Sequence, residues 1–292
     1  MQSAPTKTAR RSVALVIGSG SVKCAAAIGM HRVLLREGIK VNLIVGCSAG
    51  SMFGALIALG LSPEESKNYA EKLWTRRLTE RKNRRGLLSV LFPKWFGFTE
   101  EKFGLVHDRL IMQALIEAFG DRTFADTQIP FFVTATDFHS GEQVTLDSGL
   151  LRDAMRASIS IPFTFSPWRI GNRLYIDGFM SDPLPVGVAI RNSADIILAM
   201  GFESPHQTRI SNAGRFAFQM SSIMTNNLLK AKFAFHTAVH HAEVIPILPK
   251  FEQRIRLFDT EKIPYIIEEG AKATEAQLPY LVKLLEATVP IT

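Results

Sequence analysis

The stretch Val41-Asn42-Leu43-Ile44-Val45-Gly46-Cys47-Ser48-Ala49-Gly50 decides how this chain folds. Its apolar run, 41–45, predicts a buried strand, and a helix-like segment follows. Ser48 stands between Gly46 and Gly50 at the junction. A serine at such a sharp strand-to-helix turn is typical of a nucleophile elbow, where larger residues at the two glycine positions would collide. Because this short pattern also occurs by chance, other segments have to support it.

A loop of small residues lies upstream of this turn. The strand expected at 13–17 runs into Gly18-Ser19-Gly20-Ser21-Val22-Lys23, and a helical pattern follows. Main-chain N–H groups of such a loop lack partners within the helix and lie at the positive end of its dipole, so they can bind a phosphate or an oxyanion. A dinucleotide fingerprint would need glycine where Lys23 stands, and a P-loop would need Gly-Lys-Ser/Thr. The spacing therefore disfavours a nucleotide site.

An acid follows much later, in Tyr175-Ile176-Asp177-Gly178-Phe179. Asp-Gly is a common turn signal, and taken alone it favours a plain turn. Together with Ser48 and the upstream loop, however, Asp177 completes the set of groups that an acyl-transfer site needs.

No histidine stands where the base of a Ser-His-Asp triad is expected. An ordinary α/β-hydrolase has several strands before its elbow and its histidine last, whereas one strand precedes this elbow. His236, His240 and His241 come late enough but fall on an expected helix, with no turn to direct an imidazole at Ser48. They are interpreted as surface residues, and no third ligand with metal-site spacing accompanies them.

Three motifs in this order make the chain resemble the patatin-like phospholipases, most closely the compact bacterial single-domain members. Gly18 to Cys24 stands where the family has its glycine-rich oxyanion loop, Gly46 to Gly50 matches its Gly-x-Ser-x-Gly elbow, and Asp177 to Phe179 matches its Asp-Gly-Gly/Ala motif. The similarity covers about residues 12–200, and three connecting stretches agree with it: Thr134 to Asp137, Ala157 to Pro162 and Pro183 to Val186.

The resemblance implies a serine–aspartate dyad without a histidine, and no cofactor or metal. Ser48 would be the nucleophile, Asp177 the general base, and Gly46 and Gly50 the elbow glycines. Burial would raise the pKa of the aspartate and make it a better base. The loop would bind the carbonyl oxygen of the substrate through an oxyanion hole, whose members here are Gly18, Ser19, Gly20, Ser21 and Lys23.

The loop also departs from the family pattern. Ser19, Ser21, Lys23, Cys24 and Phe179 stand where the family usually has Gly, Gly, Arg, Gly and Gly or Ala. Serine keeps the main-chain donors, but a positive φ at Ser19 would cost about 1 kcal/mol relative to glycine. Lys23 keeps the charge of arginine without its planar fork. These changes leave the dyad intact and keep an attenuated or altered activity open.

The chain has 292 residues, of which 47% are hydrophobic, and this composition predicts a single domain. We expect that domain to span residues 12–292. Residues 1–11 are polar and basic, with no apolar stretch behind them, and are expected to form a disordered tail. The uncharged run Leu43–Leu61 is interpreted as a buried strand–turn–helix and not as a membrane span. Two cysteines, Cys24 and Cys47, predict buried thiols in a reducing compartment. We expect a cytoplasmic protein, with a peripheral position on the inner face of the membrane as the alternative.

The fold class expected from the alternation of strands and helices, and from the resemblance, is α/β: a three-layer α/β/α patatin-like fold with a largely parallel central sheet. Strands are expected at 13–17, 41–45, 130–137, 173–177, 195–200 and 244–247. Helices are expected at 25–37, 49–60, 63–75, 107–119, 150–158, 211–240 and 261–287. Asp182 stands where the family often has asparagine and is interpreted as a loop residue.

An insertion at about 76–103 combines basic and aromatic residues. The basic run Arg76–Arg85 precedes an apolar patch that includes Trp95–Phe98. Such a segment suits an anionic membrane surface, and a solvated charge run followed by a loop packed on the core is the alternative. Nucleic acid is not expected despite the net charge of +7, because no nucleic-acid-binding module is visible.

The function expected is that of a lipid acyl hydrolase acting on phospholipid or lysophospholipid esters through an acyl-Ser48 intermediate. Two alternatives stay open at this point. One is an acyltransferase that uses the same site, and the other is a catalytically weak regulator that binds lipid or membrane and keeps the fold.

Overall fold

The computed structural model describes residues 11–73, 75, 78, 82–202, 210, 213–239 and 242–286. Residues 1–10 of the expected basic tail lie outside these ranges. So do Arg76, Arg77 and Arg81 of the expected basic run, and His240 and His241.

The strands of the described chain form one eight-stranded mixed sheet, in the order β5-β6-β3-β2-β1-β7-β8, with β4 paired to β3. The strands are β1 (Val13–Ile17), β2 (Leu43–Cys47), β3 (Phe131–Asp137), β4 (Gln143–Leu146), β5 (Trp168–Ile170), β6 (Arg173–Asp177), β7 (Ile196–Met200) and β8 (Glu243–Ile247). The five strands from β3 to β8 in this order pair in parallel, whereas β4, β5 and β6 pair antiparallel. The expected largely parallel sheet is confirmed.

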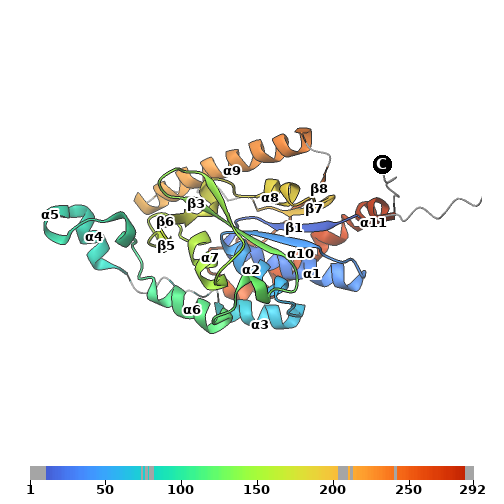
Figure 1. Cartoon of the computed structure of the whole chain (residues 1–292), viewed down its shortest axis with the longest axis horizontal. Coiled ribbons are helices and arrows are strands. Elements are labelled where there is room, and N and C mark those ends of the chain that lie inside the picture. Colours follow the sequence, from blue (N-terminus) through green and yellow to red (C-terminus); the bar gives the residue numbers. More distant parts are fainter. Residues whose placement is uncertain are drawn as a thin grey trace, which may run out of the picture.

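Helices cover both faces of this sheet (Figure 1). One face carries α1 (Ala26–Arg36), α2 (Ala49–Ala58), α3 (Pro63–Leu73), α6 (Arg109–Phe119), α7 (Leu151–Ser158), α10 (Ile263–Glu275) and α11 (Leu278–Glu286), and the other carries α8 (Val186–Arg191) and α9 (Ala213–Val239). The short helices α4 (Arg84–Leu91) and α5 (Pro93–Phe96) project from one end of the molecule. The three-layer α/β/α class is therefore confirmed.

The central strand β1 shows how the sequence builds two cores. Leu15 and Ile17 point into the cluster that α1, α2 and α10 share, while Ala14 and Val16 point into the cluster beneath α8 and α9. All of β1 is buried, as expected for a parallel strand covered on both faces. A continuous apolar run therefore marks the middle of the sheet.

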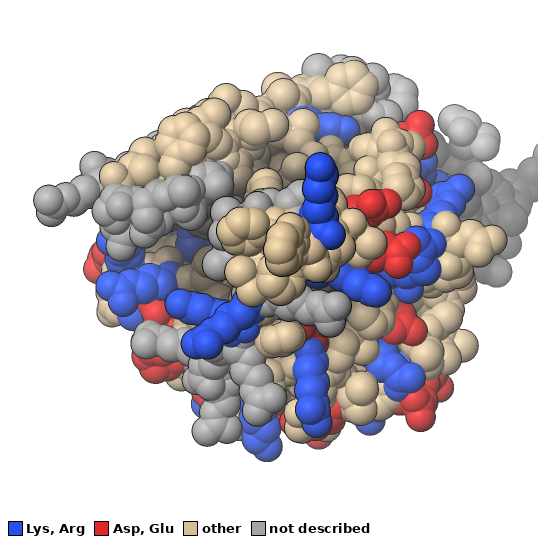
Figure 2. Space-filling view, turned by 90° about the vertical axis from the view of Figure 1, so that its left-hand side faces the viewer, with Lys and Arg blue, Asp and Glu red and all other residues tan. Residues whose placement is uncertain are grey.

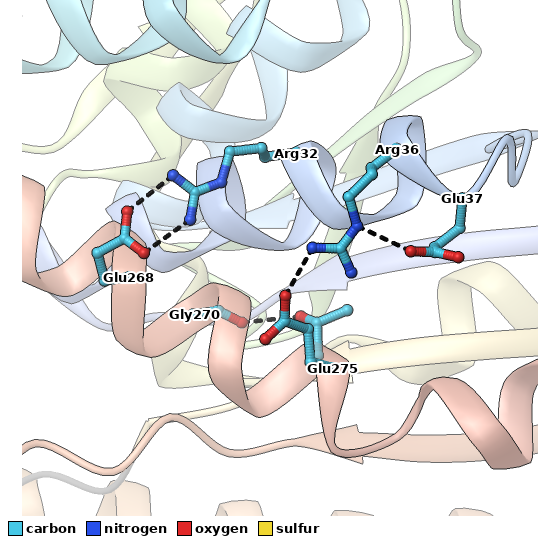
Figure 3. Close-up of polar contacts among 7 residues, drawn as sticks. Arg32, Arg36, Glu37, Glu268, Gly270 and Glu275 are labelled. Atoms are coloured by element: carbon cyan, nitrogen blue, oxygen red, sulfur yellow. Dashed lines mark hydrogen bonds and ion pairs between the residues drawn. The ribbon is translucent and has the colours of Figure 1, made fainter.

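The closest helix pair is α1 and α10, which meet at glycines. A Cβ on Gly29 would lie 1.9 Å from the Ile267 carbonyl oxygen, and one on Gly270 would lie 2.1 Å from that of Ala26. At the solvent edge of this contact, Arg32 forms two hydrogen bonds with Glu268, and Arg36 reaches Glu275 and Glu37 (Figure 3). Exposed ion pairs contribute little, so the glycine contact and the apolar core hold the two helices together.

Several boundaries differ from those expected. β2 begins at Leu43 because the Asn42 side chain accepts from the Val13 N–H, 2.9 Å away, and so occupies the start of the ladder. The helix expected at 261–287 is two helices, α10 and α11. The expected insertion contains α4 and α5, which the sequence pattern did not indicate, and β4, β5 and α8 were not expected either.

Candidate active site

Ser48 lies at the sharp turn between β2 and α2. Its φ of 54° and ψ of −132° are unusual for a residue with a side chain. A Cβ on Gly46 would lie 2.4 Å from Ser51 Cα, and one on Gly50 would lie 2.4 Å from the Ile17 carbonyl oxygen. Neither position has room for a side chain, so glycine at both lets the chain reverse this tightly.

Asp177 reaches Ser48 across one strand of the sheet. The register places Cys47 opposite Thr134 and Asp177 opposite Ala135, so consecutive residues of β3 align the ends of β2 and β6. Ser48 Oγ donates to Asp177 Oδ2 at 2.7 Å, and the Phe179 N–H donates to Asp177 Oδ1 at 3.1 Å. The structure thus brings together two side chains that are 129 residues apart in the sequence.

Burial dominates the electrostatics of this pair. Asp177 is fully buried, which raises its pKa to about 7, although its hydrogen bonds from Phe179 and Ser48 oppose the rise. A carboxylate with this pKa can accept and release a proton near neutral pH. Ser48 retains only 6% of its exposure.

The expected oxyanion loop closes against the neighbouring strands. The Gly18 N–H donates to the Met200 carbonyl at 2.9 Å, and the Ser19 N–H donates to the Pro183 carbonyl at 2.8 Å. The Gly20 N–H has no acceptor among the described residues. Of these three N–H groups, the Gly20 N–H is the one that could donate to a substrate oxygen without breaking an existing main-chain hydrogen bond.

Within this loop Ser21 has a positive φ, 57°, and Ser19 does not. Ser21 stands at the fourth position of the loop, and its hydroxyl donates to the Leu257 carbonyl, which ties the loop to the segment before α10. The Lys23 ammonium lies 6.0 Å from the centre of the Phe251 ring. Phe179 is half-buried and offers its N–H to Asp177.

Both cysteines are buried and bonded to the main chain. The Cys24 thiol donates to the Gly18 carbonyl at 3.3 Å, and the Cys47 thiol donates to the Asp182 carbonyl at 3.4 Å. Burial raises the pKa of both thiols. They therefore stay protonated near neutral pH, and neither is poised as a nucleophile.

The partners of the Asp182 side chain include Leu184 and Lys232. It is 2% exposed, accepts from the Leu184 N–H at 3.2 Å and lies 3.7 Å from the Lys232 ammonium of α9. Burial raises its pKa to about 6, and Lys232 opposes the rise. It remains a loop residue, as expected.

Two buried polar residues of α7 also belong to the site, and the sequence reasoning gave them no role. Ser158 Oγ accepts from the Ser48 N–H at 2.8 Å, and Arg156 is fully buried, with its Nη1 donating to Ser160 Oγ at 2.7 Å. The sequence carries a partial signal for them, because Ser158 lies in the stretch 157–162 that resembles the family, whereas Arg156 lies just before it.

The remaining expectations concern metals and membrane spans. Within the described residues, no group of three or more His, Cys, Asp and Glu side chains could hold a metal ion. None of the helices in those same ranges has both the length and the apolar character that crossing a bilayer requires. Leu43–Leu61 forms a strand, a turn and a helix, as expected.

Comparisons with known proteins identify the family of this chain. A family model described as patatin-like phospholipase matches residues 15–190. An uncharacterised NTE family protein of Mycobacterium bovis is 31% identical over 188 residues, which are 64% of this chain and 48% of that protein. Patatin-like phospholipase domain-containing protein 7 of Rattus norvegicus is 27% identical over 210 residues, or 70% of this chain and 14% of that protein. The chain thus spans about half, or less, of the length of these curated relatives.

The fold has a counterpart among solved structures. VipD from Legionella pneumophila aligns with a TM-score of 0.50 and 14% identity, over 95% of this chain and 67% of that one. This likeness concerns the fold alone. The family match is the stronger finding, because it covers more than half of the 292 residues and includes both the elbow and Asp177. The chain belongs to the patatin-like phospholipase family.

Proposed function

We propose that this protein is a lipid acyl hydrolase of the phospholipase A or lysophospholipase type, with Ser48 as nucleophile and Asp177 as general base. One observation carries the proposal: the hydrogen bond of 2.7 Å from Ser48 Oγ to Asp177 Oδ2, in a chain of the patatin-like phospholipase family. Phospholipid and lysophospholipid esters are the substrate class that this family suggests.

Acylation begins with Asp177 ionised. Because burial raises the pKa of Asp177 to about 7, its carboxylate is a stronger base than an ordinary aspartate. Oδ2 takes the proton of Ser48 Oγ while this oxygen attacks the ester carbonyl. When the tetrahedral intermediate collapses, Asp177 gives the proton to the leaving alcohol, and an acyl-Ser48 ester remains.

Deacylation repeats these steps with water. Asp177, again ionised, takes a proton from a water molecule as the water oxygen attacks the acyl carbon. Collapse of the second tetrahedral intermediate releases the fatty acid and breaks the bond to Ser48 Oγ, which takes back the proton from Asp177. One residue thus serves as base and acid in both halves of the cycle.

The oxyanion of each intermediate needs donors that are fixed in advance. We place the N–H groups of Gly20 and Ala49 in this role, since neither has an acceptor among the described residues. Ala49 is the first residue of α2, so the positive end of that helix dipole adds to the stabilisation. One such donor typically contributes about 3 kcal/mol in the transition state. Gly18, Ser19, Ser21 and Lys23 then shape the loop around it.

We propose further that an anionic membrane surface binds the end of the molecule from which α4 and α5 project. Phe92, Trp95, Phe96 and Phe98 are exposed there, Trp95 at 87%. The exposed cations beside them are Lys82, Arg84, Lys94 and Lys102. Figure 2 shows this end as a knob of uncharged side chains with Lys and Arg close to it, and with Asp and Glu on its right-hand side in this view. Aromatic rings suit the headgroup layer, and each cation adds about 1 kcal/mol at an anionic surface.

The N-terminal half of α9 extends this surface. Phe216, Met220 and Met224 follow one another at intervals of four residues and are 57%, 45% and 64% exposed, so they form one apolar stripe. Neither the segment 84–98 nor α9 contains an Asp or Glu. The end of α9 that carries the stripe lies at the same end of the molecule as α4 and α5 (Figure 1), and the surface between the knob and the ridge above it is hollowed in Figure 2.

Product analysis tests the proposed function. Wild-type protein is incubated with vesicles of phosphatidylglycerol and phosphatidylcholine, and the lipids are identified by mass spectrometry. We expect free fatty acid and lysophospholipid, and their loss in Ser48→Ala. Addition of glycerol distinguishes an acyltransferase, because acylated glycerol would then replace free fatty acid.

A regulator would give a different result. In that case wild-type protein would release no fatty acid and would not react with a fluorophosphonate, although it would still sediment with the vesicles. This combination of results would contradict the proposed hydrolase activity but not the proposed membrane-binding surface.

A further inference from the structure

A buried hydroxyl group holds the main chain of Ser48. Ser158, the last residue of α7, is fully buried. Its Oγ accepts from the Ser48 N–H at 2.8 Å and donates to the Thr134 carbonyl at 2.7 Å. Because a hydroxyl has a single proton, these two bonds fix its direction.

The position of this hydroxyl in the sheet is unusual. The Ile44 N–H donates to the Pro130 carbonyl, and the parallel β2–β3 ladder repeats every two residues. Two repeats further along, the same kind of bond would join the Ser48 N–H directly to the Thr134 carbonyl. Ser158 Oγ stands between these two groups instead. It completes the ladder while the main chain of Ser48 turns away from β3 into the elbow.

The same turn of chain holds the other half of the dyad. The Ser160 carbonyl accepts from the Asp177 N–H at 3.1 Å. Ser160 Oγ in turn accepts from Arg156 Nη1 at 2.7 Å and donates to the Arg156 carbonyl at 2.9 Å. Residues 156–160 therefore contact the main chain of both Ser48 and Asp177.

Arg156 makes this turn rigid. Its Nη2 donates to the Ser166 carbonyl at 3.0 Å and to the carboxylate of Asp108, and its guanidinium lies 5.5 Å from the ring centre of Phe165 and 5.2 Å from that of Trp168. A buried cation with several partners is costly to move. The end of α7 is thus fixed relative to the loop at 160–166.

We infer that Ser158 is a positioning residue for the proposed reaction: its hydroxyl, inserted between Ser48 N–H and Thr134 C=O, sets the strained turn that directs Ser48 Oγ at Asp177. This inference rests on the proposed function. Without the hydroxyl, the buried Ser48 N–H and Thr134 carbonyl lose their hydrogen-bond partner. Ser48 can then leave its unfavourable φ, and this would change the direction of its side chain.

Ser51 provides a matched control. It is also a fully buried serine, and its Oγ donates to the Ser48 carbonyl at 2.6 Å. That carbonyl keeps a second donor, the Ser51 N–H at 2.9 Å. Ser51→Ala therefore removes a buried hydroxyl next to Ser48, while the Ser48 carbonyl keeps a hydrogen-bond donor.

The test measures the rate constant of fluorophosphonate labelling at Ser48. We expect Ser158→Ala to lower it about 100-fold, the effect typical of a displacement of about 1 Å between reacting groups. Ser51→Ala should stay within a few-fold of wild type, and Ser158→Thr should recover part of the loss because it restores the hydroxyl. Ser158→Cys, which keeps the volume, replaces Ser158→Ala if that variant does not fold.

The pH dependence of the labelling rate constant tests the positioning role of Ser158 separately, because a merely structural role would leave this dependence unchanged. The hydrogen bond from Ser48 lowers the pKa of Asp177, so its loss in Ser158→Ala should shift the acidic limb of the profile to higher pH. The profile of Ser51→Ala should not move. Cys24 and Cys47 do not complicate the profile, since burial raises the pKa of both thiols.

Equal labelling of Ser158→Ala and wild type, or equal losses in Ser158→Ala and Ser51→Ala, would overturn the inference. Failure of wild-type protein to label would instead count against the proposed function. A crystal structure of Ser158→Ala then decides the inference separately. If Ser48 keeps its positive φ and its hydroxyl still donates to Asp177, Ser158 does not position it.

Discussion

The proposed dyad, Ser48 and Asp177, and the projecting α4–α5 segment both depart from the usual rules of a stable fold, but in opposite ways. At the dyad, a carboxyl group is fully buried with no cation of the described chain paired to it, and a serine has a positive φ. At the projection, aromatic side chains are exposed, led by Trp95 at 87%. Natural proteins accept such losses of stability mainly where function requires them.

The difference lies in what each region can do without a partner. The geometry of the dyad is complete within the chain, because β2, β3, β6 and α7 fix it through hydrogen bonds between 2.7 and 3.1 Å long. The exposed aromatic groups of the projection gain free energy only when something else covers them. Changes at the dyad should therefore affect the chemical step, whereas changes at the projection should affect binding to a lipid surface.

The largest effect is expected from Asp177→Asn. An amide cannot take the serine proton, so hydrolysis of a soluble p-nitrophenyl ester should fall about 10²–10⁴-fold, the usual contribution of a general base. Asp182→Asn is the matched control, since it also changes a buried aspartate but one that faces Lys232. It should keep activity within a few-fold of wild type. If the two variants lost similar amounts of activity, Asp177 would have a structural role like that of Asp182 and not the role of a general base.

The second prediction concerns stability and pH. The pKa of Asp177 is about 7 in the folded protein and about 4 in an unfolded chain. Between these values the folded state holds the proton and the unfolded state does not, so this group makes stability fall as pH rises from about 4 to about 7. The amide that replaces the carboxyl group in Asp177→Asn does not titrate in this range. As pH rises across this window, the unfolding free energy of Asp177→Asn should therefore increase relative to that of wild type, by up to about 4 kcal/mol.

Urea unfolding of both proteins at pH 5 and pH 8.5 measures the larger part of this gain, about 3 kcal/mol. The comparison cancels the contribution of Asp182, whose pKa burial raises to about 6, because both proteins keep this residue. A difference between the two proteins that does not change with pH would mean that Asp177 is ionised with an ordinary pKa, and the proposed base would lose its physical support.

The same comparison explains what the sequence could predict. The elbow glycines and the apolar β1 each carry a steric or packing requirement that acts over a few residues, so the turn at Ser48 and the middle of the sheet were within reach of the sequence. The pairing of Ser48 with Asp177 follows instead from the resemblance to the family, because no local requirement joins residues so far apart in the chain. The role of Ser158 was not within reach, because it depends on a register between β2 and β3 that joins residues far apart in the chain. The position of the positive φ in the loop, at Ser21, could not be predicted from the sequence for a similar reason. Contacts of the loop with Met200, Pro183 and Leu257 decide which residue takes it.

The smallest effect is expected at the projection. The double change Trp95→Ser and Phe98→Ser should weaken sedimentation with phosphatidylglycerol vesicles about 30-fold, since each of the two exposed rings would contribute only about 1 kcal/mol at the headgroup layer. Hydrolysis of the soluble ester should not change, because neither residue belongs to the dyad. Leu35→Ser is the control: Leu35 is 54% exposed on α1, which lies outside the proposed surface, so its loss should leave vesicle binding intact. If the control weakened binding as much as the double change, the contact would be unspecific. If the double variant bound vesicles fully, the stripe Phe216, Met220 and Met224 of α9 would be changed next. Full binding after both sets of changes would show that this protein does not bind membranes through the proposed surface.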